Sequence, residues 1–445
     1  MFDLAIIGGG PAGYTAAERA AVGGLSVVLF ETNQLGGVCL NEGCIPTKTL
    51  LYSAKLYHNA LVSAKYGVVC GDVQFDYEKM VLRKNKVVRK LNAAIRAKMT
   101  AHHITVINGA AVASKTADYV SVLCNDQTFE AKHLLIATGS KTAIPPIKNV
   151  ESAPFWTSRE ALETKRIPQS LVIIGGGVIG MEFAGLFATF GCKVSVVEMA
   201  PEILPSVDCE IASLLRAEYE QRGIAFYTGA KVLEINENSI CYANATGENT
   251  ITAEQLLICV GRRPNLDGVE SLGLDLSRAG IRTDATMRTS EPCIYAVGDV
   301  TGYSMLAHTA EREAEVAVNN ILGKTDQMSY HAVPAVVYTN PEVAGVGRTE
   351  EEMCLAGQPY QILKLPMTYS GRFVAENEGG NGLCKLVIDA REVVVGAHLI
   401  GNPASELISS AVMAVESGMT VSQFRKIIFP HPSVSEIFKE TLFVS

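Results

Sequence analysis

The chain has 445 residues, which at roughly 150 residues per domain predicts about three domains. Hydrophobic residues make up 48% and charged residues 19%, a composition that supplies sizeable cores and excludes a disordered or low-complexity chain. The formal net charge of −8, without a long basic run, argues against a nucleic-acid-binding or membrane-surface protein.

The N-terminal segment is apolar but does not resemble a secretion signal, because no basic residue precedes it and the early charge is Asp3. The other long uncharged run, residues 170–181, is glycine-rich and far shorter than the ~20 residues that span a membrane. Nine of the 11 cysteines are scattered singly, which is typical of a reducing compartment. We therefore expect a cytoplasmic protein without a leader segment or a membrane span.

The N-terminal stretch LAIIGGGPAGYTAAERAAVGGLSVVLFE has a counterpart 167 residues later, LVIIGGGVIGMEFAGLFATFGCKVSVVE. Each copy predicts a strand, a G-x-G-x-x-G turn, a helix and a second strand that ends in an acid. In such a βαβ unit the glycines allow a tight turn, close approach to a pyrophosphate and helix–strand packing, while the acid binds ribose hydroxyls. Two dinucleotide sites are predicted, with Gly8, Gly10, Gly13 and Glu31 in the first and Gly175, Gly177, Gly180 and Glu198 in the second.

Further apolar strands are expected in LLIATGS (134–140), LLICVGRRPN (256–265) and IYAVGDV (294–300), and helices over 79–99 and about 308–322. The last 115 or so residues differ, because KLVIDA and VVVGAHLI alternate like antiparallel strands. Thr349 and Glu352 form a capping-box pattern, and a helix is expected to end at Gly418. The sequence predicts an α/β protein with two Rossmann-like nucleotide-binding domains and a third, α+β domain.

Cys39 and Cys44 in GGVCLNEGCIPTK are a close cysteine pair with three possible roles. Zinc needs four ligands, usually as two close pairs, and no second pair or adjacent histidine is present, so no metal site is expected. A permanent structural disulfide across five residues closes too short a loop to add much stability. We interpret the pair as a reducible dithiol. A helix starting near it, and Lys48 one turn after Cys44, would stabilise a thiolate, although a lone lysine is usually a solvated one.

Cysteines do not readily exchange hydride with a nicotinamide, so a flavin is the natural intermediary and FAD and a nicotinamide nucleotide are the expected cofactors. Glu198 ends the second strand of the second unit, where an acid favours the free ribose hydroxyls of NAD and repels a 2′-phosphate. The first basic residue after it is Arg216, so NAD is favoured over NADP.

The doubled fingerprint and GGVCLNEGCIPTK resemble the pyridine nucleotide-disulfide oxidoreductases over essentially the whole chain. Within that family, PAVVYTNPEVAGVG (334–347) and HPSVSE (431–436) are most similar to the dihydrolipoamide dehydrogenases. The resemblance implies oxidation of protein-bound dihydrolipoamide to lipoamide, with reduction of NAD⁺, by a homodimer. It also implies an FAD-binding domain over 1–143 and 265–326, an NAD-binding domain over 144–264 and an interface domain over 327–445.

The resemblance also implies residue roles. Cys44 would be the flavin-side thiol and Cys39 the thiol that exchanges with substrate. His431 would be the base, oriented by Glu436 and supplied across the dimer interface. The cofactor-binding residues would be Lys48 beside the isoalloxazine and paired with Glu182, Asp299 at the ribityl and phosphate portion, Gly139, Gly261 and Ala307, and the two fingerprints.

A base is needed on chemical grounds, because a thiol with a pKa of about 8.5 is mostly protonated near pH 7. Without the resemblance, His431 beside a proline is more typical of a turn or an interface. The chain departs from the family at Phe429, where a second histidine is common, at Ser433, which replaces a threonine, and at Glu42, an acid inside the cysteine loop.

The expected partner is a lipoylated protein, either the E2 component of a 2-oxoacid dehydrogenase or the glycine cleavage H-protein. The alternative is an NAD(P)H-dependent reductase of another disulfide, similar to glutathione reductase. A non-catalytic flavoprotein with an idle disulfide is the third hypothesis.

Overall fold

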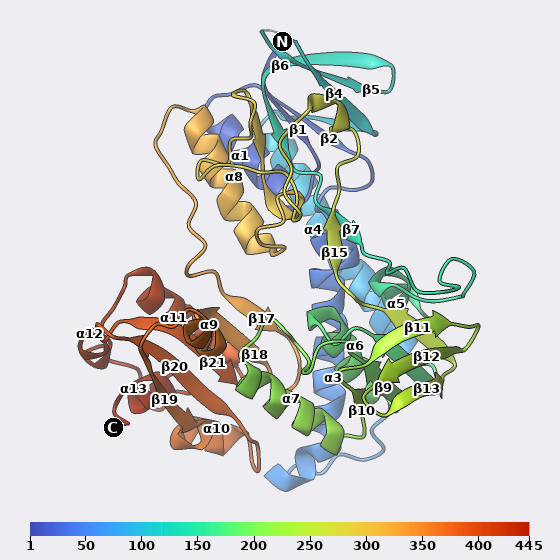
Figure 1. The fold of residues 1–445 in the computed structure, drawn as a ribbon, viewed down its shortest axis with the longest axis vertical. Coiled ribbons are helices and arrows are strands. Elements are labelled where there is room, and N and C mark those ends of the chain that lie inside the picture. Colours follow the sequence, from blue (N-terminus) through green and yellow to red (C-terminus); the bar gives the residue numbers. More distant parts are fainter. Residues whose placement is uncertain (117, 445) are drawn as a thin grey trace. The chain divides into compact units, whose positions relative to one another are not determined.

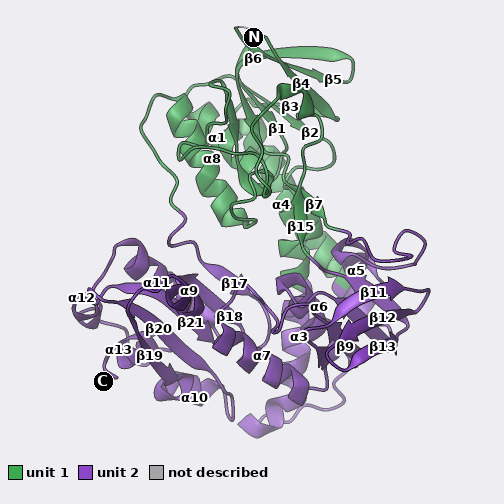
Figure 2. Cartoon of the chain, in the orientation of Figure 1, with its two compact units in different colours: residues 1–49, 81–143, 261–329 green, residues 50–80, 144–260, 330–445 purple. Residues whose placement is uncertain are grey.

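The computed structural model describes residues 1–116 and 118–444, which form two compact units (Figures 1 and 2). Unit 1 contains residues 1–49, 81–143 and 261–329, and unit 2 contains residues 50–80, 144–260 and 330–445. Each unit is therefore assembled from three stretches that are distant in the sequence. The bounds of the four expected domain segments stay a prediction.

Unit 1 is built on a seven-stranded sheet whose central strand alternates between two cores. Leu4 and Ile6 enter one buried cluster, and Ala5 and Ile7 enter another on the opposite face. A strand covered on both faces reads as a continuous apolar run, which is why the sequence showed no alternation there. The sheet order is β3 (Thr105–Asn108), β2 (Val27–Glu31), β1 (Phe2–Ile7), β6 (Gln127–Ile136), β5 (Val120–Cys124) and β4 (Ala111–Lys115), and β16 (Ile294–Ala296) also pairs with β6.

The strands that carry the first fingerprint are parallel: β1 pairs with β2 and β6, and β2 pairs with β3. Helices α1 (Pro11–Val22) and α8 (Ala307–Ile321) lie side by side (Figure 1), and buried alanines of both helices belong to one hydrophobic cluster. The expected helix over 79–99 is α4 (Tyr77–Ala101), two residues longer at each end. Unit 1 also contains the short β7 (Ser140–Thr142) paired with β15 (Arg262–Pro264), and the 3-10 turns η2 (Glu270–Leu272) and η3 (Gly298–Val300).

Three of the expected strands end earlier than the segments that predicted them. β6 ends at Ile136, β14 (Gln255–Ile258) ends before Gly261, and β16 ends before Gly298. The following glycines, Gly139, Gly261 and Gly298, have φ of 70°, 115° and 77°. A positive φ cannot continue a strand, so the backbone leaves each sheet at its carboxyl edge, where ligands of open α/β sheets bind.

The first half of unit 2 repeats the parallel architecture. A four-stranded sheet has the order β10 (Ala225–Tyr227), β9 (Lys193–Val197), β8 (Ser170–Ile174) and β14, and every described pairing in it is parallel. Beside it lie the antiparallel strands β11 (Lys231–Ile235), β12 (Ser239–Asn244) and β13 (Gly247–Thr252). The helices are α5 (Ser158–Glu163), α6 (Val178–Thr189) and α7 (Cys209–Gln221).

The C-terminal part of unit 2 is a five-stranded antiparallel sheet, as the alternating pattern predicted. Its order is β17 (Ala335–Val337), β18 (Val343–Gly347), β21 (Val394–Ile400), β20 (Leu383–Asp389) and β19 (Tyr360–Pro366). The predicted capping box between Thr349 and Glu352 is confirmed. The helices are α9 (Glu350–Leu355), α10 (Gly371–Glu376), α11 (Ala404–Glu416), α12 (Val421–Arg425) and α13 (Glu436–Leu442).

The parallel strands around each glycine fingerprint and the antiparallel C-terminal sheet confirm the expected fold class, an α/β protein with two nucleotide-binding domains and a third, α+β domain. Within residues 1–116 and 118–444, no helix combines the length and the apolar character that a membrane span requires.

Candidate active site

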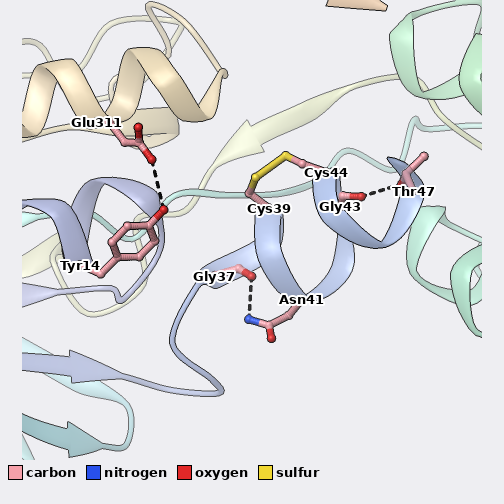
Figure 3. The surroundings of a disulfide bond; sticks show 8 residues. All are labelled: Tyr14, Gly37, Cys39, Asn41, Gly43, Cys44, Thr47 and Glu311. Carbon is pink, nitrogen blue, oxygen red and sulfur yellow. Dashed lines mark hydrogen bonds between the residues drawn. A yellow bond between two sulfur atoms is a disulfide. The ribbon is translucent and has the colours of Figure 1, made fainter. Parts of the chain in front are cut away.

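Cys39 and Cys44 are joined as a disulfide, and their Cα atoms are 4.6 Å apart (Figure 3). Cys39 lies in α2 (Gly37–Glu42), and Cys44 is the first residue of α3 (Cys44–Val62). Gly43 between the helices has φ −144° and ψ −103°, so the helical path breaks there. Residues five apart on one continuous helix would point in different directions, and this break lets the two sulfurs meet.

The loop that carries the cysteines is held by side-chain bonds to its own backbone. The Asn41 amide donates to the carbonyl oxygens of Gly37 at 2.9 Å and Leu35 at 3.1 Å. At the other end, Thr47 donates to the Gly43 carbonyl through its backbone N–H at 3.1 Å and its hydroxyl at 2.6 Å (Figure 3). These bonds hold the backbone at both ends of the disulfide loop.

Cys44 occupies the N-terminus of a 19-residue helix. The unpaired amides and dipole at a helix N-terminus stabilise a thiolate, which suits Cys44 for holding negative charge. Lys48 follows one turn later and is partly buried. Lys48 belongs to unit 1 and Glu182 to unit 2, so their pairing stays a prediction. Glu182 is 3% exposed and accepts a hydrogen bond from the Tyr338 N–H at 3.0 Å.

The first glycine fingerprint forms a cradle that fits a dinucleotide. Gly8 has φ +107°, and a Cβ added there would lie 2.1 Å from the Ala137 oxygen; one added at Gly13 would lie 1.8 Å from the Gly8 oxygen. At Gly10, by contrast, the nearest described atom outside its chain neighbours would be the Gly37 Cα at 3.7 Å. Gly8 and Gly13 are thus required for packing, while Gly10 leaves the N-terminus of α1 open to a pyrophosphate.

The second fingerprint repeats this division of roles. A Cβ at Gly175 would lie 2.4 Å from the Cys259 oxygen, and one at Gly180 would lie 2.1 Å from the Gly175 oxygen. A Cβ at Gly177 would meet no atom of the described residues within 4 Å. The open position is again the residue that precedes the helix, here α6.

The acids at the ends of β2 and β9 are held in the same way. Glu31 accepts from the N–H groups of Gly9 at 2.7 Å and Asn33 at 2.8 Å. Glu198 accepts from the N–H groups of Gly176 and Ala200, both at 2.6 Å. Each carboxylate oxygen therefore has a fixed direction and keeps a second lone pair for a ribose hydroxyl.

Arg216, the first basic residue after Glu198, is engaged elsewhere. Its guanidinium donates to both carboxylate oxygens of Glu202, at 2.8 and 3.0 Å, and to Glu220 at 2.9 Å. An NADP site needs a cation at the 2′-phosphate, and this arginine already neutralises two acids. The surroundings of Glu198 therefore fit NAD.

The His431 ring and the Glu436 carboxylate are within hydrogen-bonding distance, with Nδ1 2.9 Å from Oε1. The Ser433 N–H donates to the other carboxylate oxygen at 2.9 Å, and these two bonds, the backbone one first, lower the pKa of Glu436. The His431 side chain is 81% exposed. Phe429, where a second histidine is common, packs partly buried against the core of the C-terminal sheet.

A model of the pyridine nucleotide-disulphide oxidoreductases matches residues 2–314, and a model of the dimerisation domain of the same family matches residues 333–442. The chain belongs to this family. Its members use FAD and a pyridine nucleotide, so the expected cofactors are those of the family.

Similar proteins span the whole chain. The dihydrolipoyl dehydrogenase of Chlorobaculum tepidum is 37% identical over 100% of this chain and 97% of its own length. That of Bacillus subtilis is 36% identical, over 99% and 97%. Among solved structures, the HOCl-induced flavoprotein disulfide reductase RclA from Escherichia coli has a TM-score of 0.87 and 29% identity, covering 100% of both chains. LpdA from Mycobacterium tuberculosis has a TM-score of 0.89 and 26% identity, covering 99% of both.

Among the remaining candidates of this oxidoreductase, Asp299 lies in η3 and accepts a hydrogen bond from the Ser140 hydroxyl. Gly139 and Gly261 precede the paired strands β7 and β15, and Ala307 is the first residue of α8. Gly139, Ser140, Gly261, Asp299 and Ala307 all belong to unit 1, together with the first fingerprint and the disulfide.

Glu313 was not predicted as a site residue; it is fully buried in α8 and accepts a hydrogen bond from the N–H of Gly298, next to Asp299. Its signal was an acid on the apolar face of an amphipathic helix, between Ala310 and Ala314. Tyr14 was missed as well. Its hydroxyl donates to Glu311 at 3.1 Å near the disulfide (Figure 3), and burial, followed by the Glu311 charge, raises the pKa of this tyrosine.

Proposed function

We propose that this chain is a dihydrolipoyl dehydrogenase, which oxidises protein-bound dihydrolipoamide to lipoamide and reduces NAD⁺ to NADH. The observation that carries the proposal is a disulfide whose Cys44 is the first residue of α3, in a chain with two glycine turns that fit dinucleotides. The full-length similarity to dihydrolipoyl dehydrogenases supports the same activity.

In the proposed first step, His431 accepts a proton from one thiol of the substrate. Its Nδ1–H donates to Glu436, which leaves the Nε2 lone pair as the acceptor and stabilises the imidazolium that forms. The substrate thiolate attacks Sγ of Cys39, the Sγ–Sγ bond breaks, and Cys44 leaves as a thiolate at the helix N-terminus.

In the second step, the other substrate thiol loses its proton and attacks the substrate sulfur that is bound to Cys39. Cyclic lipoyl disulfide leaves, and Cys39 takes up a proton as a thiol. Bound FAD supplies the two-electron chemistry that links this dithiol to hydride transfer onto NAD⁺. Gly8, Gly10, Gly13, Glu31 and Asp299 are the residues that would hold it.

The proposal extends to the partner and the setting. A match to the family's dimerisation domain supports a homodimer, in which we propose that His431 and Glu436 of one subunit serve the disulfide of the other. The exposure of His431 is compatible with a role at an interface. A lipoylated carrier protein is the proposed substrate, and the nine cysteines outside the disulfide support the reducing cytoplasm as the compartment.

The test compares two reactions of the purified flavoprotein. We expect NADH formation from dihydrolipoamide and NAD⁺, and much slower NADPH oxidation with glutathione disulfide. The reverse preference would establish the alternative, a reductase of another disulfide. Inactivity in both reactions, with FAD bound, would contradict both enzyme hypotheses.

A further inference from the structure

The turn that carries Asp299 is held at its first residue by a buried acid. Gly298 opens η3 with a φ of 77°, and its N–H donates to the Glu313 carboxylate at 2.5 Å. Glu313 lies in α8 and is 0% exposed. The Gly298 carbonyl oxygen accepts from the Thr301 N–H at 3.0 Å and from the Thr301 hydroxyl at 2.9 Å. Both polar groups of the Gly298 backbone therefore have fixed partners.

This turn is also packed against the two helices of unit 1 that lie side by side. A Cβ added at Gly298 would lie 3.4 Å from Cβ of Ala310 in α8 and 3.5 Å from Cβ of Ala12 in α1. Gly298 is itself buried, so water does not readily replace the Glu313 oxygen as the acceptor of its N–H. Removal of that oxygen would leave a buried donor unsatisfied, and such a donor favours a rearranged turn.

The Asp299 side chain is held separately, from β7. The Ser140 hydroxyl donates to Oδ2 of Asp299, and the Arg262 Nε–H donates to the same hydroxyl oxygen at 2.7 Å. Because arginine can only donate, the hydroxyl proton of Ser140 is directed to Asp299. Among residues 1–116 and 118–444, Oδ1 of Asp299 has no hydrogen-bond partner. This oxygen is therefore the acceptor that remains for a ligand.

We propose that Glu313 and Ser140 are positioning residues for FAD, which hold the backbone and the carboxylate of Asp299 in their binding orientation before the flavin arrives. A carboxylate only accepts hydrogen bonds, so Oδ1 suits a ribityl hydroxyl of the flavin and not a phosphate oxygen. A site that is ordered in advance binds more tightly, because less freedom is lost on binding. The inference rests on the proposed function only for the assignment of Asp299 to the flavin.

The test measures how fast FAD leaves the loaded enzyme, without dihydrolipoamide or NAD. The enzyme is incubated with an excess of isotopically labelled FAD, and mass spectrometry of the protein-bound flavin gives the exchange rate. Glu313→Met should raise this rate about tenfold, because the Gly298 N–H loses its acceptor. Glu313→Gln keeps an acceptor oxygen and should stay within about threefold of the wild type. Equal acceleration in both variants would show that the oxygen is not the cause and would overturn the proposal.

A double-mutant cycle separates positioning from general loosening of the fold. Asp299→Ala should itself accelerate exchange. Glu313→Met or Ser140→Ala, added to Asp299→Ala, should add less than about threefold, because the side chain that both residues position is then absent. Undiminished effects in that background would refute the proposal. Glu315→Gln is the matched control in α8, since Glu315 is partly exposed and lies 3.6 Å from Arg19; the control should exchange FAD at the wild-type rate, and a similar acceleration there would also refute the proposal.

Ser140 provides a second pair of variants. Ser140→Ala should accelerate exchange several-fold, because Asp299 loses the donor to Oδ2, whereas Ser140→Thr keeps the hydroxyl and should remain close to the wild type. If Glu313→Met does not fold, this pair decides, and an unchanged rate in Ser140→Ala overturns the proposal. The exchange assay contains no disulfide substrate. Its result is therefore distinct from failure of the proposed dehydrogenase activity.

Discussion

The Glu436 carboxylate holds the His431 ring through a 2.9 Å contact between Oε1 and Nδ1, while its other oxygen is held by the Ser433 N–H. The backbone bond prevents the carboxylate from turning, so the imidazole is kept in the tautomer whose Nε2 can accept a proton. This arrangement arises within six residues at the start of α13 and is independent of any second subunit.

His431→Gln should slow oxidation of dihydrolipoamide about 10²- to 10⁴-fold, the usual contribution of a positioned general base. Electron transfer from NADH to an artificial dye does not need this base and should stay within about threefold of the wild type. Both rates are measured on the same preparation. Equal losses in the two assays would assign the effect to misfolding and would contradict the catalytic role.

Cys39→Ser should abolish dithiol turnover while FAD remains bound, because the serine oxygen cannot form the mixed disulfide with substrate. The absorbance spectrum and the molar ratio of FAD to protein report on binding, and NADH formation reports on turnover. Cys70→Ser, at an exposed cysteine outside the disulfide, is the matched control and should keep full activity. Residual turnover above about 1% in Cys39→Ser would exclude the assigned attack site.

Glu198→Gln should weaken NAD⁺ binding. The amide keeps an oxygen for one backbone N–H but loses the charge and one acceptor that bind the ribose hydroxyls. We expect KM for NAD⁺ to rise about tenfold with kcat nearly unchanged, since the reacting end of the nucleotide is not altered. A fall in kcat at unchanged KM would show that the acid has another role. Discrimination against NADP⁺ should decrease in the same variant.

His398 links stability to pH. Its ring is 3% exposed and Nε2 lies 2.8 Å from the Arg348 carbonyl oxygen, and burial, which outweighs this bond, lowers the pKa. A histidine that is neutral in the fold binds its proton in the unfolded chain below pH 6.5, so stability is present above that pH and is lost as the pH falls through it. The loss is at most about 1.4 kcal/mol per pH unit.

The measurement is urea unfolding at pH 7.5 and 5.5 for the wild type and His398→Gln. The variant should be less stable at pH 7.5, because Gln fits the site imperfectly, but should lose less stability on acidification than the wild type does. Equal pH dependence in both proteins would show that His398 is not the group that titrates.

Lys385 in β20 is buried among carboxylates from the N-terminal ends of α7 and α9. Its Nζ lies 2.9 Å from Asp208, 2.6 Å from Glu350 and 3.2 Å from Glu210, and the side chains of Lys385 and Asp208 are 1% and 0% exposed. Lys385→Met should cost roughly 3–5 kcal/mol, because Asp208 would remain buried without its cation.

Adding Asp208→Asn to Lys385→Met should recover part of that loss, since the uncompensated charge is then removed and Asn can still cap α7 through its side-chain oxygen. Chemical unfolding of the three proteins measures both effects. A double variant that is less stable than Lys385→Met would contradict this explanation.

The sequence by itself determined the elements of the site that depend on local spacing. The two glycine fingerprints and their acids were readable because a βαβ unit places the strand, the turn, the helix and the acid within about 25 residues. The cysteine pair could be predicted for the same reason. The His431–Glu436 pair is also local, but its role was predicted from the resemblance to known proteins. The apolar runs predicted the strands but placed their carboxyl ends too late, because a positive φ at Gly139, Gly261 and Gly298 is not encoded by hydrophobicity.

The tertiary structure alone decided which distant residues surround these elements. Arg262 binds Ser140 across 122 positions of sequence, and Ser140 binds Asp299 across 159. Lys385 meets Asp208 across 177 positions. No local pattern marks such partners, because the sequence around a polar residue is the same whether its side chain contacts solvent or a buried charge. Only the packing of the sheets brings these groups together, and their shared burial makes the interactions strong.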